Sequence, residues 1–471
     1  MKIGVFIQAY KFQLLLVLSS MLFYGTFAYN LDRTDGVKLV LLYAALYGLF
    51  YKIIKLTKHQ RGLLIGLAFI FRAIFIVAIP NLSQDFYRFI WDGRLVLAGF
   101  NPYLFTPNFF VLQNQFPIEQ AQTLFNGMGA LSAGNYSNYP PINQFCFAIA
   151  GIFAHKSILG SVVILRLLII AADFGILYYG NKLLQHFKLP KYLIFWYLLN
   201  PFIIIELTGN LHFEGVMLFF LIWSLYLLIQ KKWISAAVIF ACSVSVKLIP
   251  LLFLPLFFNW FQTKTPTNNR QLPLFKSVNF AQLVWFYALV GLVTIGLFLP
   301  FYTPEFVVNY SKTVALWFQK FEFNASFYYL FRAIGYWLTG YNTIAVIGSF
   351  TALFVSIFVF TYGIITKPKN GRQLIQMMLV VLSVYYFTAT TVHPWYLAPL
   401  VLFSVYTPFK FPLVWSFVVI FSYLAYSNTA HTENLWLIAF QYFVVFAALG
   451  SDIFKIRRTA KQPNTSTKTS I

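Results

Sequence analysis

Long apolar runs dominate this sequence and limit what it can fold into. A membrane-crossing helix needs about 20 apolar residues. Hydrophobic residues make up 60% of the chain and charged residues only 10%, whereas about a quarter of a soluble domain is charged. The sequence therefore predicts an all-α polytopic membrane protein, with one multi-span domain over residues 1–458. Runs of spanning length fall near 11–29, 37–55, 62–80, 160–181, 190–207, 212–230, 281–300, 343–366, 373–391 and 434–452.

Shorter apolar runs leave the number of crossings open. They lie at 233–246, 248–259, 395–407 and 411–427. With these runs included, the expected bundle has about 11–14 transmembrane helices. Asp173 lies inside the run 160–181, where we expect it to pair with a polar group of the bundle, and Arg166 lies two turns away on the same face.

The charge balance predicts how the chain is oriented. Lys and Arg number 34 against 12 Asp and Glu, a formal net charge of +22. Nucleic acid is not an expected partner, because the basic residues are scattered between apolar runs rather than gathered on one soluble face. The positive-inside rule explains them better, since one alternating threading puts most basic loops and both termini on the cytoplasmic side of the cell membrane. Most acidic residues then fall on the outer side, where we expect the polar chemistry.

The same threading gives two large outer loops. The first covers residues 80–159 and the second covers 301–340. The apolar run 142–154 within the first loop is interpreted as an interfacial or re-entrant helix, because a crossing there would place the basic loop 182–191 outside. The middle of the first loop, 111–138, is rich in polar and small residues and is predicted to be a surface loop.

The C-terminal end of the chain, 459–471, is predicted to be a disordered cytoplasmic tail.

A cluster of charges opens the first loop. Asp85, Arg88, Asp92 and Arg94 lie within one short stretch next to a long apolar run. Charges at the mouth of a membrane segment are costly, so such a cluster is a candidate functional site. Asp85 could act as a general base whose pKa is raised by partial desolvation. The alternative is a loop aspartate that pairs with Arg88 or caps the following helix.

Further candidates come from distant parts of the chain that the threading brings to one face. Lys247 has no acidic neighbour in sequence, so it could bind an anion such as a lipid phosphate, or could simply snorkel at a helix end. We expect Asp85 to be catalytic and Lys247, Arg88 and His393 to bind a donor phosphate. The expected substrate-binding residues are Asp92, Asn210, His212, Trp395 and Tyr396.

These motifs occur in a familiar order. They are Asp85-Phe-Tyr-Arg-Phe-Ile-Trp-Asp-Gly-Arg94, Gly99-Phe-Asn-Pro-Tyr103, Tyr139-Pro-Pro-Ile-Asn-Gln144, Asn200-Pro with Gly209-Asn-Leu-His212, Lys247-Leu-Ile-Pro, and His393-Pro-Trp-Tyr396. The series resembles C-type (GT-C) membrane glycosyltransferases, above all bacterial polyprenol-phosphate-mannose-dependent mannosyltransferases. It is more faintly similar to the eukaryotic enzyme that adds the first mannose to GPI anchors.

The resemblance implies an enzyme that moves a hexose, and mannose in particular, from a polyprenyl-phosphate sugar to a glycan or glycolipid acceptor. Transfer would take place at the outer face of the lipid bilayer with inversion, and Asp85 occupies the place of the family's catalytic base. GPI-type enzymes carry Asp-x-Asp there, whereas this chain reads Ser83-Gln84-Asp85. The missing first carboxylate weakens the case for a divalent metal. No cofactor and no metal are expected, although metal dependence stays open.

Two other classes of function fit a polytopic chain. A transporter or flippase of lipid-linked sugars would show internal repeats and mid-membrane charges, and no repeat is visible. A surface-polysaccharide polymerase or ligase would share the membrane and the donor class. The sequence leaves the sugar, the acceptor, the linkage and the oligomeric state open.

Overall fold

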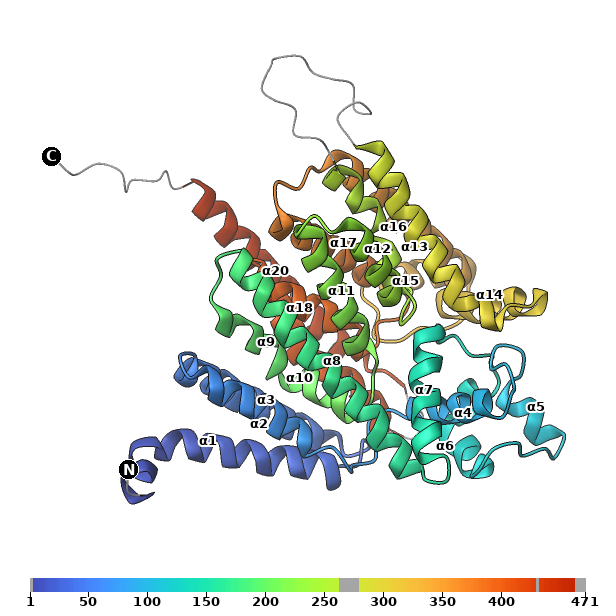
Figure 1. Ribbon diagram of the computed structural model, residues 1–471, viewed down its shortest axis with the longest axis horizontal. Coiled ribbons are helices and arrows are strands. Elements are labelled where there is room, and N and C mark those ends of the chain that lie inside the picture. The colour runs from blue at the N-terminus through green and yellow to red at the C-terminus, as the bar shows by residue number, and fades with distance from the viewer. Residues whose placement is uncertain (1–2, 262–278, 429–431, 462–471) are drawn as a thin grey trace, which may run out of the picture.

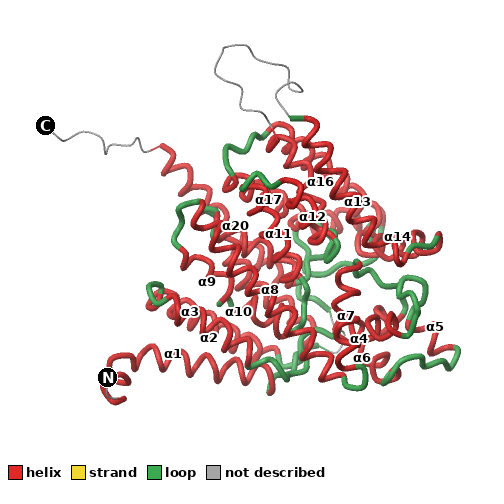
Figure 2. The backbone as a smooth tube through the Cα atoms, in the orientation of Figure 1, coloured by secondary structure: helices red, strands yellow, loops and turns green. Residues whose placement is uncertain are grey.

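The computed structural model describes residues 3–261, 279–428 and 432–461. These residues form helices joined by loops, as Figure 2 shows. Within the described ranges the strand-like pairing is an isolated bridge between Phe323 and Thr391. The prediction of an all-α polytopic membrane protein is confirmed.

Within the described residues, six helices are long and apolar enough to cross a membrane. A seventh crossing is possible if the pair Lys191–Leu198 and Pro201–Gly209, bent by 51°, counts as one span. The six belong to α1 (Ile3–Tyr29), α2 (Gly36–Thr57), α8 (Ile158–His186), α13 (Phe280–Phe298) with η5 (Leu299–Phe301), α16 (Ile344–Ile365) and α20 (Leu435–Lys461).

The other expected crossings fall on shorter or interrupted helices, which is why fewer full-length spans are found than the 11–14 expected from the sequence. Proline is one cause, because it lacks the backbone N–H that a helix needs. Pro255, for example, lies inside the 3-10 segment η3. The shorter elements are α3 (Arg61–Ala73), η1 (Lys191–Ile194), α9 (Phe195–Leu198), α10 (Pro201–Ile203), η2 (Ile204–Gly209), α11 (Glu214–Ile229), α12 (Trp233–Val244), η3 (Ile249–Phe261), α17 (Gly371–Thr388), η6 (Pro394–Leu397), α18 (Ala398–Tyr406), α19 (Phe411–Val418) and η7 (Val419–Ser427).

The first large loop folds into its own group of helices at one end of the molecule (Figure 1). A Cβ on Gly93 would lie 2.1 Å from the carbonyl oxygen of Phe147, so only glycine permits this close crossing of α4 and α7. The helix interpretation of 142–154 matches α7, which is too short to cross a bilayer. The group consists of α4 (Asp85–Leu97), α5 (Pro107–Leu112), α6 (Ala121–Ala133) and α7 (Pro141–Ala154).

The surface-loop prediction for 111–138 is wrong over α6. This helix packs against α4 and buries Leu124 and Met128. Its apolar residues lie between polar and small ones, so composition hid a helix whose stability comes from packing.

The second large loop also folds into helices, α14 (Pro304–Gln319) and α15 (Phe327–Thr339). Hydrogen bonds from side chains of both loops connect it to the first loop. The Asn101 amide donates to the carbonyl oxygen of Phe301 (2.9 Å), and the Asn309 amide donates to that of Tyr103 (3.2 Å). The two loops therefore form one structure at this end of the protein.

A buried ion pair joins α3 to α8. Arg72 Nε lies 2.7 Å from Asp173 Oδ2, and both side chains are almost fully buried. The prediction that Asp173 pairs inside the bundle is confirmed. Arg166 has a different role, because it donates to the carbonyl oxygens of Ile76, Thr208 and Gly209 and so anchors the end of η2.

The predicted tail begins inside a helix. Helix α20 continues to Lys461, so residues 459–461 are helical rather than disordered. The rest of the predicted tail, 462–471, lies outside the described residues. So do Lys264, Arg270 and Lys276, three of the basic residues that the positive-inside rule assigns to the cytoplasmic side.

Candidate functional site

A cavity of about 220 Å³ lies where the two large loops meet the helices of the bundle. Six of the nine residues predicted to form the site line it together. The other three, Asp92, Asn210 and His212, lie behind its wall. The six that line it are Asp85, Arg88, Lys247, His393, Trp395 and Tyr396, and the wall also includes Arg33, Tyr139, Tyr423 and Tyr426.

Asp85 is the first residue of α4 and is partly buried in the cavity wall. Its backbone N–H donates to Ser83 Oγ (3.3 Å), while Asn210 Oδ1 accepts from the N–H of Leu82 (3.2 Å) and holds the preceding turn. Among the residues that the structure describes, none forms a hydrogen bond or ion pair with the Asp85 carboxylate. The carboxylate is therefore available to a substrate.

The surroundings of Asp85 make it a stronger base than an ordinary aspartate. Burial raises the pKa of the Asp85 carboxyl to about 6. The positive charge of Lys247 opposes this rise, and the Glu214 carboxylate adds to it. A base works best when its pKa lies near the working pH, so this shift suits proton abstraction.

Lys247 lies across the same cavity and has an acidic partner that the sequence did not reveal. Its Nζ is 3.1 Å from Glu214 Oε1 at the start of α11, and 5.4 Å from the centre of the Tyr139 ring. Glu214 Oε2 has no hydrogen-bond partner in the described structure. Glu214 holds the ammonium at the cavity wall, where an anionic ligand could share it.

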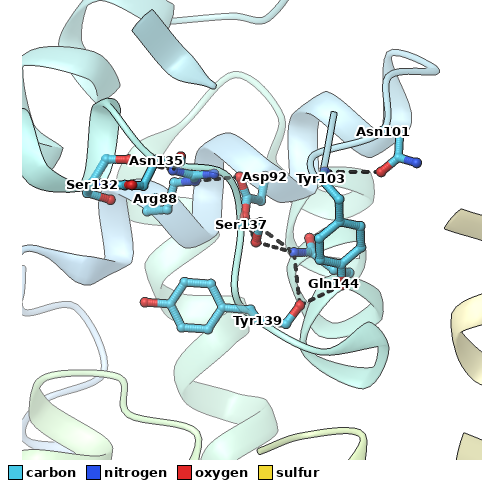
Figure 3. A network of polar contacts seen from close by, with 9 residues as sticks. All are labelled: Arg88, Asp92, Asn101, Tyr103, Ser132, Asn135, Ser137, Tyr139 and Gln144. Atoms are coloured by element: carbon cyan, nitrogen blue, oxygen red, sulfur yellow. Dashed lines mark hydrogen bonds and ion pairs between the residues drawn. The ribbon is translucent and has the colours of Figure 1, made fainter. Parts of the chain in front are cut away.

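Arg88 belongs to a buried polar network (Figure 3). Its Nε lies 2.7 Å from Asp92 Oδ1, and its Nη1 donates to the carbonyl oxygens of Ser132 and Asn135. Asp92 Oδ2 accepts from Ser137 (2.6 Å) and from the Gln144 amide (3.3 Å). Asp92 thus holds Arg88 and the segment after α6 in place.

Three rings stack beside the cavity. The His212 and Trp395 ring centres are 3.7 Å apart, and those of Trp395 and His393 are 4.5 Å apart with nearly parallel planes. Burial and the nearby Lys247 lower the pKa of His393 to about 3. The imidazole is therefore neutral near pH 7, so His393 could meet a phosphate through an N–H group but not as a cation.

Sequence reasoning missed several wall residues. The Arg33 guanidinium lies 4.6 Å from the centre of the Tyr426 ring, at the cavity edge. Tyr423 donates to the buried Glu206. Glu206 lies behind the wall, and it is one of the acidic residues that the threading places on the outer side. Tyr423 carried no signal in the sequence, being one of 30 tyrosines.

In the described part of the chain, no three His, Cys, Asp or Glu side chains come together as metal ligands would. The charged groups of the cavity wall are Asp85, Arg88, Lys247 and Arg33. Chemically, the cavity offers one available carboxylate facing several cations.

Comparison with known proteins identifies the family. A family model described as "Alpha-(1->6)-mannopyranosyltransferase, N-terminal domain" matches residues 20–263, which is just over half of the chain. The chain belongs to this family. The matched region includes Asp85, Glu206 and Lys247, and the predicted resemblance to mannosyltransferases is confirmed.

One curated relative is similar over a shorter stretch. It is alpha-(1->6)-mannopyranosyltransferase A of Corynebacterium glutamicum, 24% identical over 216 residues. The match covers 42% of this chain and 41% of the relative, so the chain spans well under half of the length of that relative. No solved structure matches the chain.

Proposed function

We propose that this protein transfers a mannosyl residue from a polyprenyl-phosphate donor to a hydroxyl group of a glycan or glycolipid at the outer face of the cell membrane. The observation that carries the proposal is the cavity in which the available carboxylate of Asp85 faces Lys247. The family supports the sugar, and its description as an α-(1→6)-mannopyranosyltransferase supports an α-(1→6) product, which requires a primary hydroxyl on the acceptor. The distribution of basic loops supports the side of the membrane.

The proposed mechanism is a single displacement. Asp85 takes the proton of the acceptor hydroxyl while the oxygen attacks the anomeric carbon of the donor. The bond between that carbon and the phosphate oxygen breaks, and polyprenyl phosphate leaves with both electrons. One displacement inverts the anomeric carbon, so an α product requires a β-linked donor.

Lys247 is proposed to stabilise the leaving phosphate. Negative charge on that phosphate increases as the bond breaks, and a cation placed there stabilises the transition state more than the ground state. The Lys247–Glu214 contact supports this role because it fixes the ammonium at the cavity wall before the donor binds. Arg33 adds positive charge to the same wall, whereas the charge of Arg88 is balanced by Asp92.

The direct test is transfer by purified protein in lipid nanodiscs. Polyprenyl-phosphate mannose and an alkyl α-mannoside should give an α-(1→6)-linked product and equimolar polyprenyl phosphate. The 6-deoxy form of the same mannoside is the control and should give no product. A flippase would move the donor between leaflets without cleaving it, and a polymerase or ligase would require preassembled glycans; either result would contradict the proposal.

Mannosyl transfer should depend on pH through Asp85. The base must be deprotonated, and its pKa is raised to about 6. The kcat/KM value is therefore expected to fall about tenfold per pH unit below that value and to level off above it. Initial rates between pH 4.5 and 8, with folding checked at each pH, would measure this. An acidic limb centred near pH 4 would mean that Asp85 is not desolvated as described.

Lys247→Met should weaken donor use. Loss of a charged hydrogen bond to phosphate is expected to raise the donor KM by roughly 10–100-fold. Because the substitution also leaves the buried Glu214 carboxylate without its partner, the elution profile of the purified variant is used to check that it is folded. Lys182→Met is a matched control, because Lys182 also lies over a tyrosine ring (4.3 Å) but does not line the cavity. If the rate of Lys247→Met depends on donor concentration as in the wild type, Lys247 does not bind the donor phosphate.

A further inference from the structure

A buried carboxylate that the proposed mechanism does not use lies behind the cavity. Glu206 is only 1% exposed and belongs to η2, a π-helical turn. Turns of this kind are rare and occur frequently at functional sites. An acidic side chain inside a membrane protein is costly and is retained where it has a task.

Glu206 is the centre of a network that reaches the cavity. The Tyr423 hydroxyl lies 2.9 Å from each of its carboxylate oxygens. The Asn210 amide is 3.5 Å from Oε2, and His212 Nε2 is 3.9 Å from the same oxygen. Tyr423 itself lies on the cavity wall with Asp85. Of these contacts, the one to Tyr423 brings the network to the cavity surface.

While the Glu206 carboxyl is ionised, this contact fixes which way the Tyr423 hydroxyl can act. A phenol has one proton to donate, and Tyr423 donates it to the Glu206 carboxylate. Its oxygen then has only lone pairs to offer toward the cavity. A phosphodiester also has only acceptor oxygens, so the two would repel. A sugar hydroxyl, in contrast, can donate a proton to the Tyr423 oxygen.

We propose that Tyr423, with its proton held by Glu206, accepts a hydrogen bond from a hydroxyl group of a substrate sugar. Glu206 is a positioning residue that acts through Tyr423. The inference rests on the proposed mannosyl transfer, which brings two sugars into the cavity, the acceptor and the mannosyl group of the donor. Both carry suitable hydroxyls, so the experiment must separate them.

Binding measurements test the inference independently of catalysis. The probes are octyl α-mannoside, which stands for the acceptor, and a short-chain prenyl-phosphate mannose, which stands for the donor. Tyr423→Phe should raise the Kd of one probe about tenfold, the value expected for a lost hydrogen bond. The affected probe identifies the sugar. Tyr43→Phe is the control, since it removes another buried hydroxyl, one that donates to the Ser416 carbonyl oxygen away from the cavity.

A second variant tests the coupling to Glu206. Glu206→Gln should weaken binding of the same probe, yet have no further effect when Tyr423 is already phenylalanine. If Tyr423→Phe does not fold, the inference is tested by Glu206→Gln alone, which should raise the Kd of one of the two probes. Unchanged Kd values for both probes, or additive losses in the double variant, would overturn the inference. Absence of transfer by wild-type protein that still binds the probes would instead count against the proposed function alone.

Discussion

Replacing Asp85 with asparagine is expected to lower the proposed mannosyl transfer by about 10²–10⁴-fold and to leave the protein folded. Asparagine has the same shape as aspartate but cannot take the proton of the acceptor hydroxyl. Folding should be unaffected because the Asp85 carboxylate makes no hydrogen bond or ion pair with the described residues. The measurement is kcat with saturating polyprenyl-phosphate mannose, together with the elution profile of the purified variant.

Asp35→Asn is the matched control for this variant. Asp35 is exposed, caps the N-terminus of α2 through the N–H of Lys38 (3.1 Å), and does not line the cavity. Asparagine is an equally good cap, so both stability and transfer should be unchanged. Near-normal transfer by Asp85→Asn would exclude Asp85 as the base, and the Tyr423 inference could still hold.

Asp173→Ala is expected to destabilise the helix bundle by about 3–5 kcal/mol. The substitution removes the partner of Arg72 and leaves a guanidinium charge buried between α3 and α8. Arg72 also donates to the Leu198 carbonyl oxygen (2.6 Å), so the loss should spread to the bent segment that leads to Glu206. Thermal unfolding of the purified protein in one detergent would measure the loss of stability.

The double variant Arg72→Leu with Asp173→Leu separates the charge from the packing. Replacement of a whole buried ion pair by apolar side chains is often neutral, whereas removal of one partner is costly. The double variant should therefore be more stable than Asp173→Ala. Equal stability of the two would show that packing at this position, and not an uncompensated charge, accounts for the loss.

Local patterns in the sequence predicted the helices well and the loops less well. Apolar runs located α1, α2, α8, α13, α16 and α20, because a helix that faces lipid must be apolar along its length. The same criterion failed for α6, whose stability depends on its contact with α4. The 11–14 helices that it predicted exceed the six of spanning length and hydropathy among the described residues, because apolar content does not distinguish a continuous helix from one that proline interrupts.

Only part of the site was predicted, because a sequence shows which residues are neighbours along the chain but not which distant segments meet. The charges of α4 lie close together in sequence, and the pair Arg88–Asp92 is separated by a single helical turn. The partner of Lys247 was not predicted, because Glu214 starts a different helix. A side chain's neighbours in sequence say little about the residues that a distant segment will bring to it.

By itself, the sequence determined that this is a multi-span helical membrane protein, and its ordered motifs pointed to the mannosyltransferase family and to Asp85. These properties follow from hydrophobic content and from short motifs, which can be read locally. Only the tertiary structure decided which side chains meet. Tyr423 reaches Glu206 across 217 residues of chain, and Arg72 reaches Asp173 across 101. Hydrophobicity specifies that a helix face is buried but not which partner buries it, so these contacts depend on how the whole bundle packs.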